Sequence, residues 1–149
     1  MTVHYFAYGS NLDLEGKLRR WAPSAHLTSI GLLHDRRLAF TRRSTRWGAR
    51  AADVLPTRGE HVWGALFSVE DRDIPGLDAC EGAPRNYRRL GVDVETDRGT
   101  VTALTYEVVD RHLPEAAPAL LYANTLLKGA RAVGLPPHWI HTVTAQIAA

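Results

Sequence analysis

The stretch at residues 5–12, Tyr-Phe-Ala-Tyr-Gly-Ser-Asn-Leu, constrains the fold of this chain most strongly. Residues 3–8 are rich in β-branched and aromatic side chains, which favour a strand. Gly9 permits a positive φ, and Ser10 and Asn11 favour turns in which side chains bond the local backbone. The stretch is therefore predicted to be a strand that stops at Gly9 and continues as a tight, exposed loop.

A helix is predicted to follow this loop. Asp13 is a suitable N-cap. Leu14, Leu18 and Trp21 then recur at helical spacing. A loop between a buried strand and a helix start leaves several backbone N–H groups unpaired and pointing in one direction. Such a loop is suited to bind an anion or an oxyanion.

Length and composition favour one domain over residues 1–149, because a chain of this size with 45% hydrophobic residues can bury one core but hardly two. Eighteen basic and sixteen acidic residues leave a net charge of +2, so general nucleic-acid binding is not indicated. Cys80 is the single cysteine, which excludes an internal disulfide. No stretch resembles a signal peptide or a membrane span, so we expect a cytoplasmic protein.

Several strands are predicted before the middle of the chain. Two apolar runs, residues 25–34 and 37–41, are separated by the polar pair Asp35-Arg36 and are expected to form paired strands. Residues 42–59 are rich in Arg, Ser, Thr, Gly and Pro. We expect them to form a long irregular segment, in which only residues 51–55 are strand-like.

A strand followed by a helix is predicted next. Residues 61–69 have a clear strand pattern. Glu70 and Asp71 then place acids at the start of a helix that is expected to run through Cys80. Gly82 is expected to end this helix.

The second half contains the clearest hairpin, formed by residues 87–96 and 101–109 across the turn Asp97-Arg98-Gly99. The longest helical pattern covers residues 115–133, and a last helix is expected to begin at residues 136–137. Strands before and between a few helices, joined by hairpins, indicate an α+β fold and not a doubly wound parallel sheet.

Five stretches, in order along the chain, resemble the γ-glutamylcyclotransferase-like (AIG2-like) family. They are Tyr8-Gly9-Ser10-Asn11-Leu12, residues 38–40 with 47–48 and 52–54, residues 62–66, residues 77–82 with Tyr87, and Tyr122 with residues 129–130 and 134–136. The resemblance implies a small, twisted, mostly antiparallel β-barrel flanked by helices. It also implies that the loop and a glutamate line one cavity.

This resemblance also implies site residues and a reaction. Glu81 takes the position of the catalytic glutamate, and the implied substrate-binding residues are Tyr8, Gly9, Ser10, Asn11, Leu12, Tyr87 and Tyr122. In the implied reaction, the α-amine of a γ-glutamyl amide attacks its own γ-carbonyl and releases 5-oxoproline and an amine. Glu81 would carry the proton, and the loop amides would hold a carboxylate or oxyanion. No metal or cofactor is expected, and the expected partner is a small γ-glutamyl molecule, not a nucleic acid or membrane.

The position of Glu81 in the sequence independently suggests an unusual carboxyl group. It lies at the predicted C-terminal end of a helix, where the partial negative charge disfavours a carboxylate, and Asp78 lies one turn away. Both effects are expected to raise the pKa of Glu81, and burial would raise it further. A carboxyl group that exchanges its proton near neutral pH suits general acid/base catalysis.

Three other residue types have competing interpretations. Ser10 could be a nucleophile, but it lacks a Gly-x-Ser-x-Gly elbow and no adjacent base is evident, so a loop-shaping role is favoured. His138 and His141 lie one helical turn apart, but two ligands are too few for a metal site, and a surface or packing role is favoured. Cys80 is expected to be a small buried hydrophobe.

The densest charge cluster lies in residues 36–50 and contains Arg36, Arg37, Arg42, Arg43, Arg46 and Arg50. A basic segment with Trp47 is compatible with nucleic-acid binding, but most such clusters are solvated faces. One of these arginines could instead bind a substrate carboxylate. The leaving amine stays open among an amino acid, a polyamine or lysine side chain, and a carrier-bound intermediate. The alternative function is a catalytically silent relative that binds a small carboxylate or a protein partner.

Overall fold

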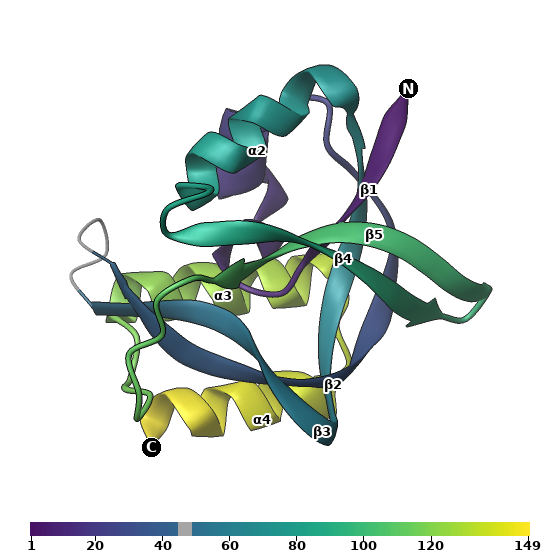
Figure 1. The fold of residues 1–149 in the computed structure, drawn as a ribbon. Coiled ribbons are helices and arrows are strands. Elements are labelled where there is room, and N and C mark those ends of the chain that lie inside the picture. Colours follow the sequence, from purple (N-terminus) through teal and green to yellow (C-terminus); the bar gives the residue numbers. More distant parts are fainter. Residues whose placement is uncertain (45–48) are drawn as a thin grey trace.

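The computed structural model describes residues 1–44 and 49–149. Its strands form a closed barrel in the order β1-β3-β2-β4-β5 (Figure 1). The strands are β1 (Thr2–Ala7), β2 (His26–Ser44), β3 (Ala49–Glu70), β4 (Tyr87–Thr96) and β5 (Gly99–Val108). All neighbours pair antiparallel except β1 and β5, which pair in parallel. The predicted α+β fold with a mostly antiparallel barrel is therefore confirmed.

Helices cover the barrel on two sides. The α-helices are α1 (Arg19–Trp21), α2 (Ile74–Glu81), α3 (Leu120–Val133) and α4 (Pro137–Ala148), and shorter helical turns occur at Ser10–Leu12, Leu14–Leu18 and Asp71–Asp73. Figure 1 shows α2 above the hairpin of β4 and β5, α3 at mid-height behind the strands and α4 at the bottom of the view. Within the described residues, no helix is long and apolar enough to span a membrane.

The core forms where the barrel strands face the helices. Phe6 of β1, Phe40 of β2 and Phe67 of β3 are each at most 1% exposed. Removing such a side chain from water stabilises the fold by about 1.5–3 kcal/mol. Because β1 ends in this core, the loop that follows it begins from a fixed position.

The β2 strand departs from the sequence prediction. Residues 25–34 and 37–41 do not pair with each other, because both runs belong to β2, which pairs with β3 along its length. The register shifts between His34 and Arg36, and Asp35 between them has a φ of 61°. The polar interruption is thus a β-bulge that bends the strand, not a turn that reverses it. The Asp35 carboxylate also accepts a hydrogen bond from the N–H of Gly59 at 3.0 Å.

The prediction of an irregular segment at residues 42–59 is also wrong. β2 continues to Ser44 and β3 begins at Ala49, and the paired residues include Arg43 with Arg50 and Arg36 with Pro56. The strand forms despite its weak local signal because β2 supplies the hydrogen-bonding partner from elsewhere in the chain. Residues 45–48, which include Arg46, Trp47 and Gly48 of the sequence motifs, lie outside the described residues.

The remaining elements follow the predictions closely. The β4–β5 hairpin and the strand at residues 61–69 form as expected, and Gly82 ends α2 in the left-handed region with a φ of 66°. α3 begins at Leu120 instead of residue 115. The side chain of Glu115 accepts the Phe40 N–H at 2.9 Å and pairs with Arg37, which ties this segment to the barrel before the helix starts.

Candidate active site

A cavity of about 180 Å³ opens where β1 ends, between the following loop, the start of β3, the C-terminal end of α2 and the helix α3. It brings together almost all of the predicted site residues: Tyr8, Gly9, Ser10, Asn11, Glu81, Tyr87 and Tyr122. Residues 8–11 and 122 come from opposite ends of the chain. The barrel therefore assembles at one place the motifs that the sequence separates.

Leu12 is the exception among the predicted substrate contacts. Its side chain is fully buried in the core and does not line the cavity. Its backbone N–H donates to the Gly9 carbonyl at 3.0 Å, which closes the short helical turn after β1. The structure thus places the Leu12 side chain as an anchor that holds the loop against the core, and a substrate contact of Leu12 stays a prediction.

Gly9 is required for a reason different from the predicted one. Its φ is −117°, so the expected positive φ is wrong. A Cβ atom at Gly9 would instead lie 2.7 Å from the hydroxyl oxygen of Tyr122 and 3.1 Å from the Cβ of Ala52. Glycine is needed here because the hydroxyl of Tyr122 occupies the space where a side chain would start.

The hydroxyl of Tyr122 is held in that space by two backbone groups. It accepts hydrogen bonds from the N–H of Ser10 at 3.3 Å and from the N–H of Ala52 at 3.1 Å. Burial raises the pKa of Tyr122 to about 12, against the lowering effect of these two bonds. The side chain is therefore a neutral phenol that joins the loop to β3.

These bonds change the predicted set of unpaired loop amides. The prediction is wrong for Ser10, whose N–H donates to Tyr122, and for Leu12, whose N–H donates to Gly9. The amides of Gly9 and Asn11 have no acceptor among the described residues. The loop thus offers two backbone donors in place of the four that were expected.

Glu81 borders the cavity at the last residue of α2, immediately before the left-handed Gly82. Its Oε1 accepts a hydrogen bond from the side-chain amide of Asn11 at 3.0 Å and one from the hydroxyl of Tyr5 at 3.5 Å. Asn11 also donates to the Tyr5 hydroxyl at 2.9 Å. The carboxylate is half-buried, and the loop of residues 9–11 orients it through Asn11.

Tyr5 is kept protonated by its surroundings. Burial raises the pKa of its hydroxyl well above the ordinary value, and the nearby charge of Glu81 raises it further. A neutral phenol can donate to the carboxylate, whereas a phenolate could not. Tyr5 therefore acts with Asn11 as an uncharged support for Glu81.

The hydroxyl groups of Tyr8 and Tyr87 point to the backbone. Tyr8 donates to the carbonyl of Tyr106 at 2.6 Å, and Tyr87 donates to the carbonyl of Ala52 at 2.6 Å. Burial raises the pKa of both hydroxyls well above the ordinary value. Because their protons are used within the protein, these two tyrosines shape the cavity wall with their rings.

Two cationic side chains also line the cavity. Lys17 donates from its Nζ to the Oγ of Ser10 at 2.5 Å. Arg42 is the member of the arginine-rich segment that lines the cavity among the described residues. Ser10 therefore has a lysine neighbour that the sequence pattern did not reveal, because the Nζ of Lys17 lies within hydrogen-bonding distance of its hydroxyl.

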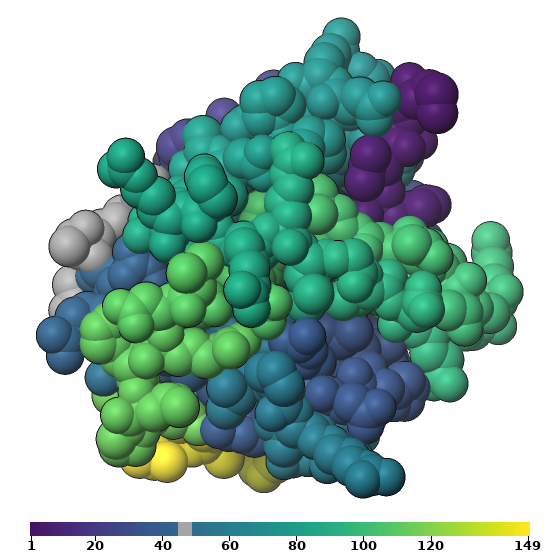
Figure 2. All heavy atoms as spheres, viewed as in Figure 1, coloured from purple at the N-terminus to yellow at the C-terminus, as the bar shows by residue number. Residues whose placement is uncertain are grey.

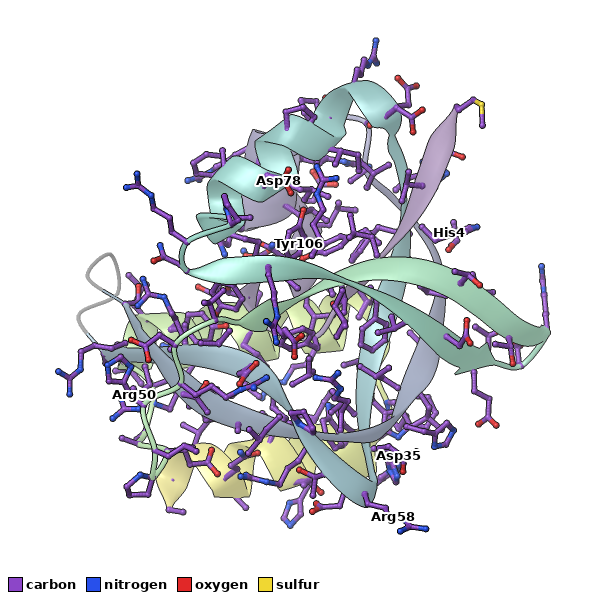
Figure 3. All side chains as sticks on the ribbon, viewed as in Figure 1. His4, Asp35, Arg50, Arg58, Asp78 and Tyr106 are labelled. Carbon is purple, nitrogen blue, oxygen red and sulfur yellow. The ribbon has the colours of Figure 1, made fainter. Side chains whose placement is uncertain are left out.

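Asp78 lies near Glu81 but its charge is compensated. The Arg89 guanidinium donates to its carboxylate at 3.0 and 2.5 Å, and the Tyr106 hydroxyl donates at 2.7 Å (Figure 3). The Arg89 hydrogen bond lowers the pKa of Asp78. This pair also joins α2 to β4, whose residues lie together on the face shown in Figure 2. The expected repulsion between Asp78 and Glu81 is consequently weakened.

Sequence reasoning missed several cavity residues: Tyr5, Lys17, Asn86 and Tyr106, as well as the identity of Arg42 within its cluster. Helical spacing gave no signal for Lys17, because Ser10 lies in the loop before the Asp13 cap and the two residues do not share a helix. The contribution of Tyr106 depends on the barrel closing, which no local pattern shows.

His138 and Cys80 both pack against neighbouring side chains. The ring of His138 packs edge-on against Trp63 at 6.2 Å. Cys80 is 8% exposed, and its Sγ donates to the Asn11 side-chain oxygen at 3.7 Å. Among the described residues, no group of three or more His, Cys, Asp and Glu side chains is placed to hold a metal ion.

Comparison with known proteins identifies the family. A family model described as the AIG2-like family matches residues 61–143. The γ-glutamylcyclotransferase of Mus musculus is 31% identical over 144 residues, which cover 93% of this chain and 75% of the mouse protein. The Homo sapiens γ-glutamylcyclotransferase is 30% identical, over 89% of this chain and 72% of the human protein. A solved structure of a γ-glutamyl cyclotransferase superposes with a TM-score of 0.90 at 28% identity, over 97% of this chain and 88% of that one. This chain is therefore a member of the AIG2-like family, with the fold of the γ-glutamylcyclotransferases.

Proposed function

We propose that this protein is a cofactor-independent γ-glutamyl cyclotransferase, with Glu81 as its general acid and base. The observation that carries this proposal is that Glu81 and the loop of residues 9–11 line one cavity, with Asn11 hydrogen-bonded to the carboxylate. The curated relatives bear the name of this activity. An intramolecular acyl transfer needs a proton carrier and hydrogen-bond donors for the oxyanion, and a carboxylate beside backbone N–H groups provides both.

The first step forms the ring. The substrate places its α-ammonium group at Glu81, which removes one proton. The nitrogen lone pair then attacks the γ-carbonyl carbon of the same molecule, and a new C–N bond closes a five-membered ring as the carbonyl electrons move onto oxygen. Holding the extended chain in a bent conformer supplies much of the rate, because both reacting groups belong to one substrate.

The second step releases the amine. The amides of Gly9 and Asn11 are the candidate donors to the oxyanion, and one well-placed donor of this kind is worth roughly 3 kcal/mol in the barrier. After ring closure the ring nitrogen still carries two protons. Glu81 gives its proton to the leaving nitrogen and takes one from the ring nitrogen as the carbonyl re-forms and the bond to the leaving nitrogen breaks, and the departing amine then takes that proton from Glu81 and leaves as an ammonium ion. The products are 5-oxoproline and a free amine, and the carboxylate is regenerated without a water molecule being consumed.

The tyrosines that surround the cavity support this chemistry. The rings of Tyr8, Tyr87 and Tyr122 line the walls, and all three are less than 9% exposed. Their hydroxyls are fixed by backbone groups of the loop and barrel. Such walls limit the volume to a compact ligand and keep bulk water away from the reacting carbonyl.

One observation favours a second candidate function. The 2.5 Å contact between Lys17 and Ser10 resembles a serine–lysine pair, in which lysine activates a serine nucleophile. In that case Ser10 would attack the γ-carbonyl and water would later release glutamate. The product distinguishes the two candidates, because cyclisation releases 5-oxoproline and hydrolysis releases glutamate.

The test is incubation of the purified protein with a panel of γ-glutamyl amides, including γ-glutamyl amino acids, a γ-glutamyl polyamine and a lysine side-chain amide. Mass spectrometry would follow 5-oxoproline, glutamate and the free amine together. Formation of 5-oxoproline and amine in equal amounts supports the proposal. Glutamate as the sole acyl product would favour the serine mechanism, and no product from any amide would favour a non-catalytic carboxylate-binding protein.

A further inference from the structure

Lys17 lines the cavity but takes no part in the proposed reaction. It lies on the π-helical turn Leu14–Leu18, which Asp13 caps by accepting the N–H of Gly16 at 3.0 Å. From this turn the side chain reaches the loop and donates to Ser10 at 2.5 Å. Its backbone position is fixed by the cap, and its ammonium group by the loop.

The cavity is therefore polarised across two consecutive residues. Ser10 accepts a hydrogen bond from the Lys17 ammonium, and Asn11 donates one to the Glu81 carboxylate. A positive and a negative side chain thus flank adjacent positions of one short loop. A small zwitterion, in which opposite charges are attached to the same carbon atom, complements this arrangement of charges.

A γ-glutamyl group carries such a zwitterion at its α-carbon. The proposed reaction assigns the α-ammonium to Glu81, which must receive a proton from it. The α-carboxylate is then directed to the opposite side of the loop, where Lys17 lies. Like charges would meet in the reversed orientation, with the carboxylate at Glu81, and this orientation is disfavoured.

We propose that Lys17 is the specificity residue for the α-carboxylate of the substrate. This inference rests on the proposed function and adds to it a reason why the γ-glutamyl group is preferred over a plain γ-aminoacyl group. The Nζ of Lys17 binds the carboxylate directly, together with the loop around Ser10. By fixing the carboxylate, Lys17 also sets which face of the α-amine points at the γ-carbonyl.

Arg42, the other cationic residue of the cavity, is less suited to this role. It donates to the backbone carbonyl of Arg43, its neighbour on β2. Lys17 contacts the loop itself at Ser10, the residue next to Asn11, whose side chain donates to Glu81. Lys17 therefore contacts the loop next to the residue that holds Glu81, whereas Arg42 contacts its own strand.

The test compares two substrates that differ in one group. The first is a γ-glutamyl amide, and the second is the γ-aminobutyryl amide of the same amine, which lacks the α-carboxylate and would cyclise to 2-pyrrolidinone. Steady-state kcat and KM are measured for the wild type, Lys17→Met and Lys17→Arg. Lys128→Met is the matched control. Lys128 is 69% exposed, does not line the cavity and pairs with Asp13 at 3.5 Å, so this variant removes a nearby lysine charge that lies outside the cavity.

In Lys17→Met we expect the preference for the γ-glutamyl substrate, as a ratio of kcat/KM values, to fall by about 10- to 100-fold, mainly through a higher KM. The rate with the γ-aminobutyryl amide should change less than threefold, roughly. Lys17→Arg should recover most of the preference, and Lys128→Met should match the wild type. An unchanged preference in Lys17→Met, or equal losses for both substrates, would overturn the proposal.

A binding measurement separates this inference from the proposed function. If the wild type forms no 5-oxoproline, calorimetric titration with 5-oxoproline and with 2-pyrrolidinone still tests Lys17. The proposal expects the wild type to bind 5-oxoproline, and Lys17→Met to bind it about tenfold more weakly or worse. Equal binding by the two proteins, or no binding by the wild type, would contradict a carboxylate site at Lys17.

Discussion

Two carboxylates in the barrel, Glu107 and Glu81, show how different surroundings prepare one chemical group for different tasks. Glu107 on β5 is buried and paired with guanidinium groups from three parts of the chain: Arg36 at 2.8 Å, Arg88 at 3.0 Å and Arg111 at 3.0 Å. Glu81 borders the cavity, where its carboxylate accepts hydrogen bonds from the Asn11 amide and the Tyr5 phenol. Burial acts to raise the pKa of Glu107, but hydrogen bonds from three arginines lower it and favour the anion, whereas the carboxylate of Glu81 lines the cavity that a substrate would enter.

The ion-paired cluster around Glu107 includes a second buried carboxylate, which lies next to the cavity wall in sequence. Asp53 on β3 is fully buried and accepts from Arg111 at 2.6 Å, from Thr41 at 2.9 Å and from the N–H of Val108 at 3.0 Å. Its neighbour Ala52 provides the backbone groups that hold the cavity tyrosines. Through Asp53, the ion-paired cluster therefore holds the segment of β3 whose backbone binds two cavity tyrosines.

Replacing Glu107 by Gln should have the largest effect on stability. The substitution leaves the surrounding arginines without their shared anion, and removing one partner of a buried ion pair costs about 3–5 kcal/mol. Because the arginines are partly exposed, we expect about 3 kcal/mol in the free energy of unfolding, measured in urea. Glu95→Gln is the control, since its pair with His34 is exposed and should change stability by less than about 0.5 kcal/mol. A loss for Glu107→Gln as small as that of the control would contradict the comparison.

Replacing Glu81 by Gln should lower turnover strongly but change stability little, the opposite of the effect at Glu107. Turnover should fall by about a hundredfold or more, equivalent to about 2.7 kcal/mol in the barrier, because a positioned proton carrier is lost. The free energy of unfolding should stay within about 1 kcal/mol of the wild type, since Gln can still accept from Asn11 and Tyr5. Rates within tenfold of the wild type would remove Glu81 from the mechanism.

The contrast between the two carboxylates also marks the limit of sequence reasoning. Glu81 was found because it ends a short helix and belongs to a recognisable motif. Glu107 lies in a strand, and its partners at residues 36, 88 and 111 are brought to it by barrel closure. Local patterns predict the hairpin of β4 and β5 and the cap at Gly82, but they contain no information on pairs between distant strands.

The same limit explains the errors in the fold prediction. Asp35 has the composition of a turn residue, and only its pairing with β3 shows that it is a bulge. Residues 49–56 contain arginine and proline and have a weak strand signal, yet β2 gives them a partner. At the site, the loop was located correctly, but the roles of Gly9 and Leu12 depend on Tyr122 and on the core, which lie far away in sequence.

Replacing Gly9 by Ala should have an intermediate effect at the site. The new Cβ would overlap the Tyr122 hydroxyl, which two backbone amides hold in place. We expect a loss of about 1–3 kcal/mol in the free energy of unfolding and a lower turnover, because the loop must shift. The matched control is Gly91→Ala on β4, where a Cβ would meet nothing within 4 Å. If both variants behaved alike in urea unfolding, close approach at Gly9 would not be the reason for its glycine.

Lowering the pH should reduce the stability that the ion-paired cluster contributes, and this is the smallest of the expected effects. Burial alone would raise the pKa of Glu107, but hydrogen bonds from three arginines lower it below the ordinary value of 4.5. A carboxylate whose pKa is lowered by folding contributes stability that is fully present above the unfolded pKa and is lost as the pH falls through the folded pKa. The unfolding free energy should therefore decline below about pH 4.5. Glu107→Gln should show a shallower decline in the same titration, and an equal slope would contradict this assignment.

The central claim, that the substrate's own amine attacks the γ-carbonyl, is tested most directly by one labelling measurement. The wild type is incubated with a γ-glutamyl amide in ¹⁸O-labelled water, and the acyl product is analysed by mass spectrometry. Because cyclisation consumes no water, the account predicts 5-oxoproline without ¹⁸O, released together with an equal amount of amine. Glutamate carrying one ¹⁸O atom as the main product would show that water completes the reaction, and would contradict the account.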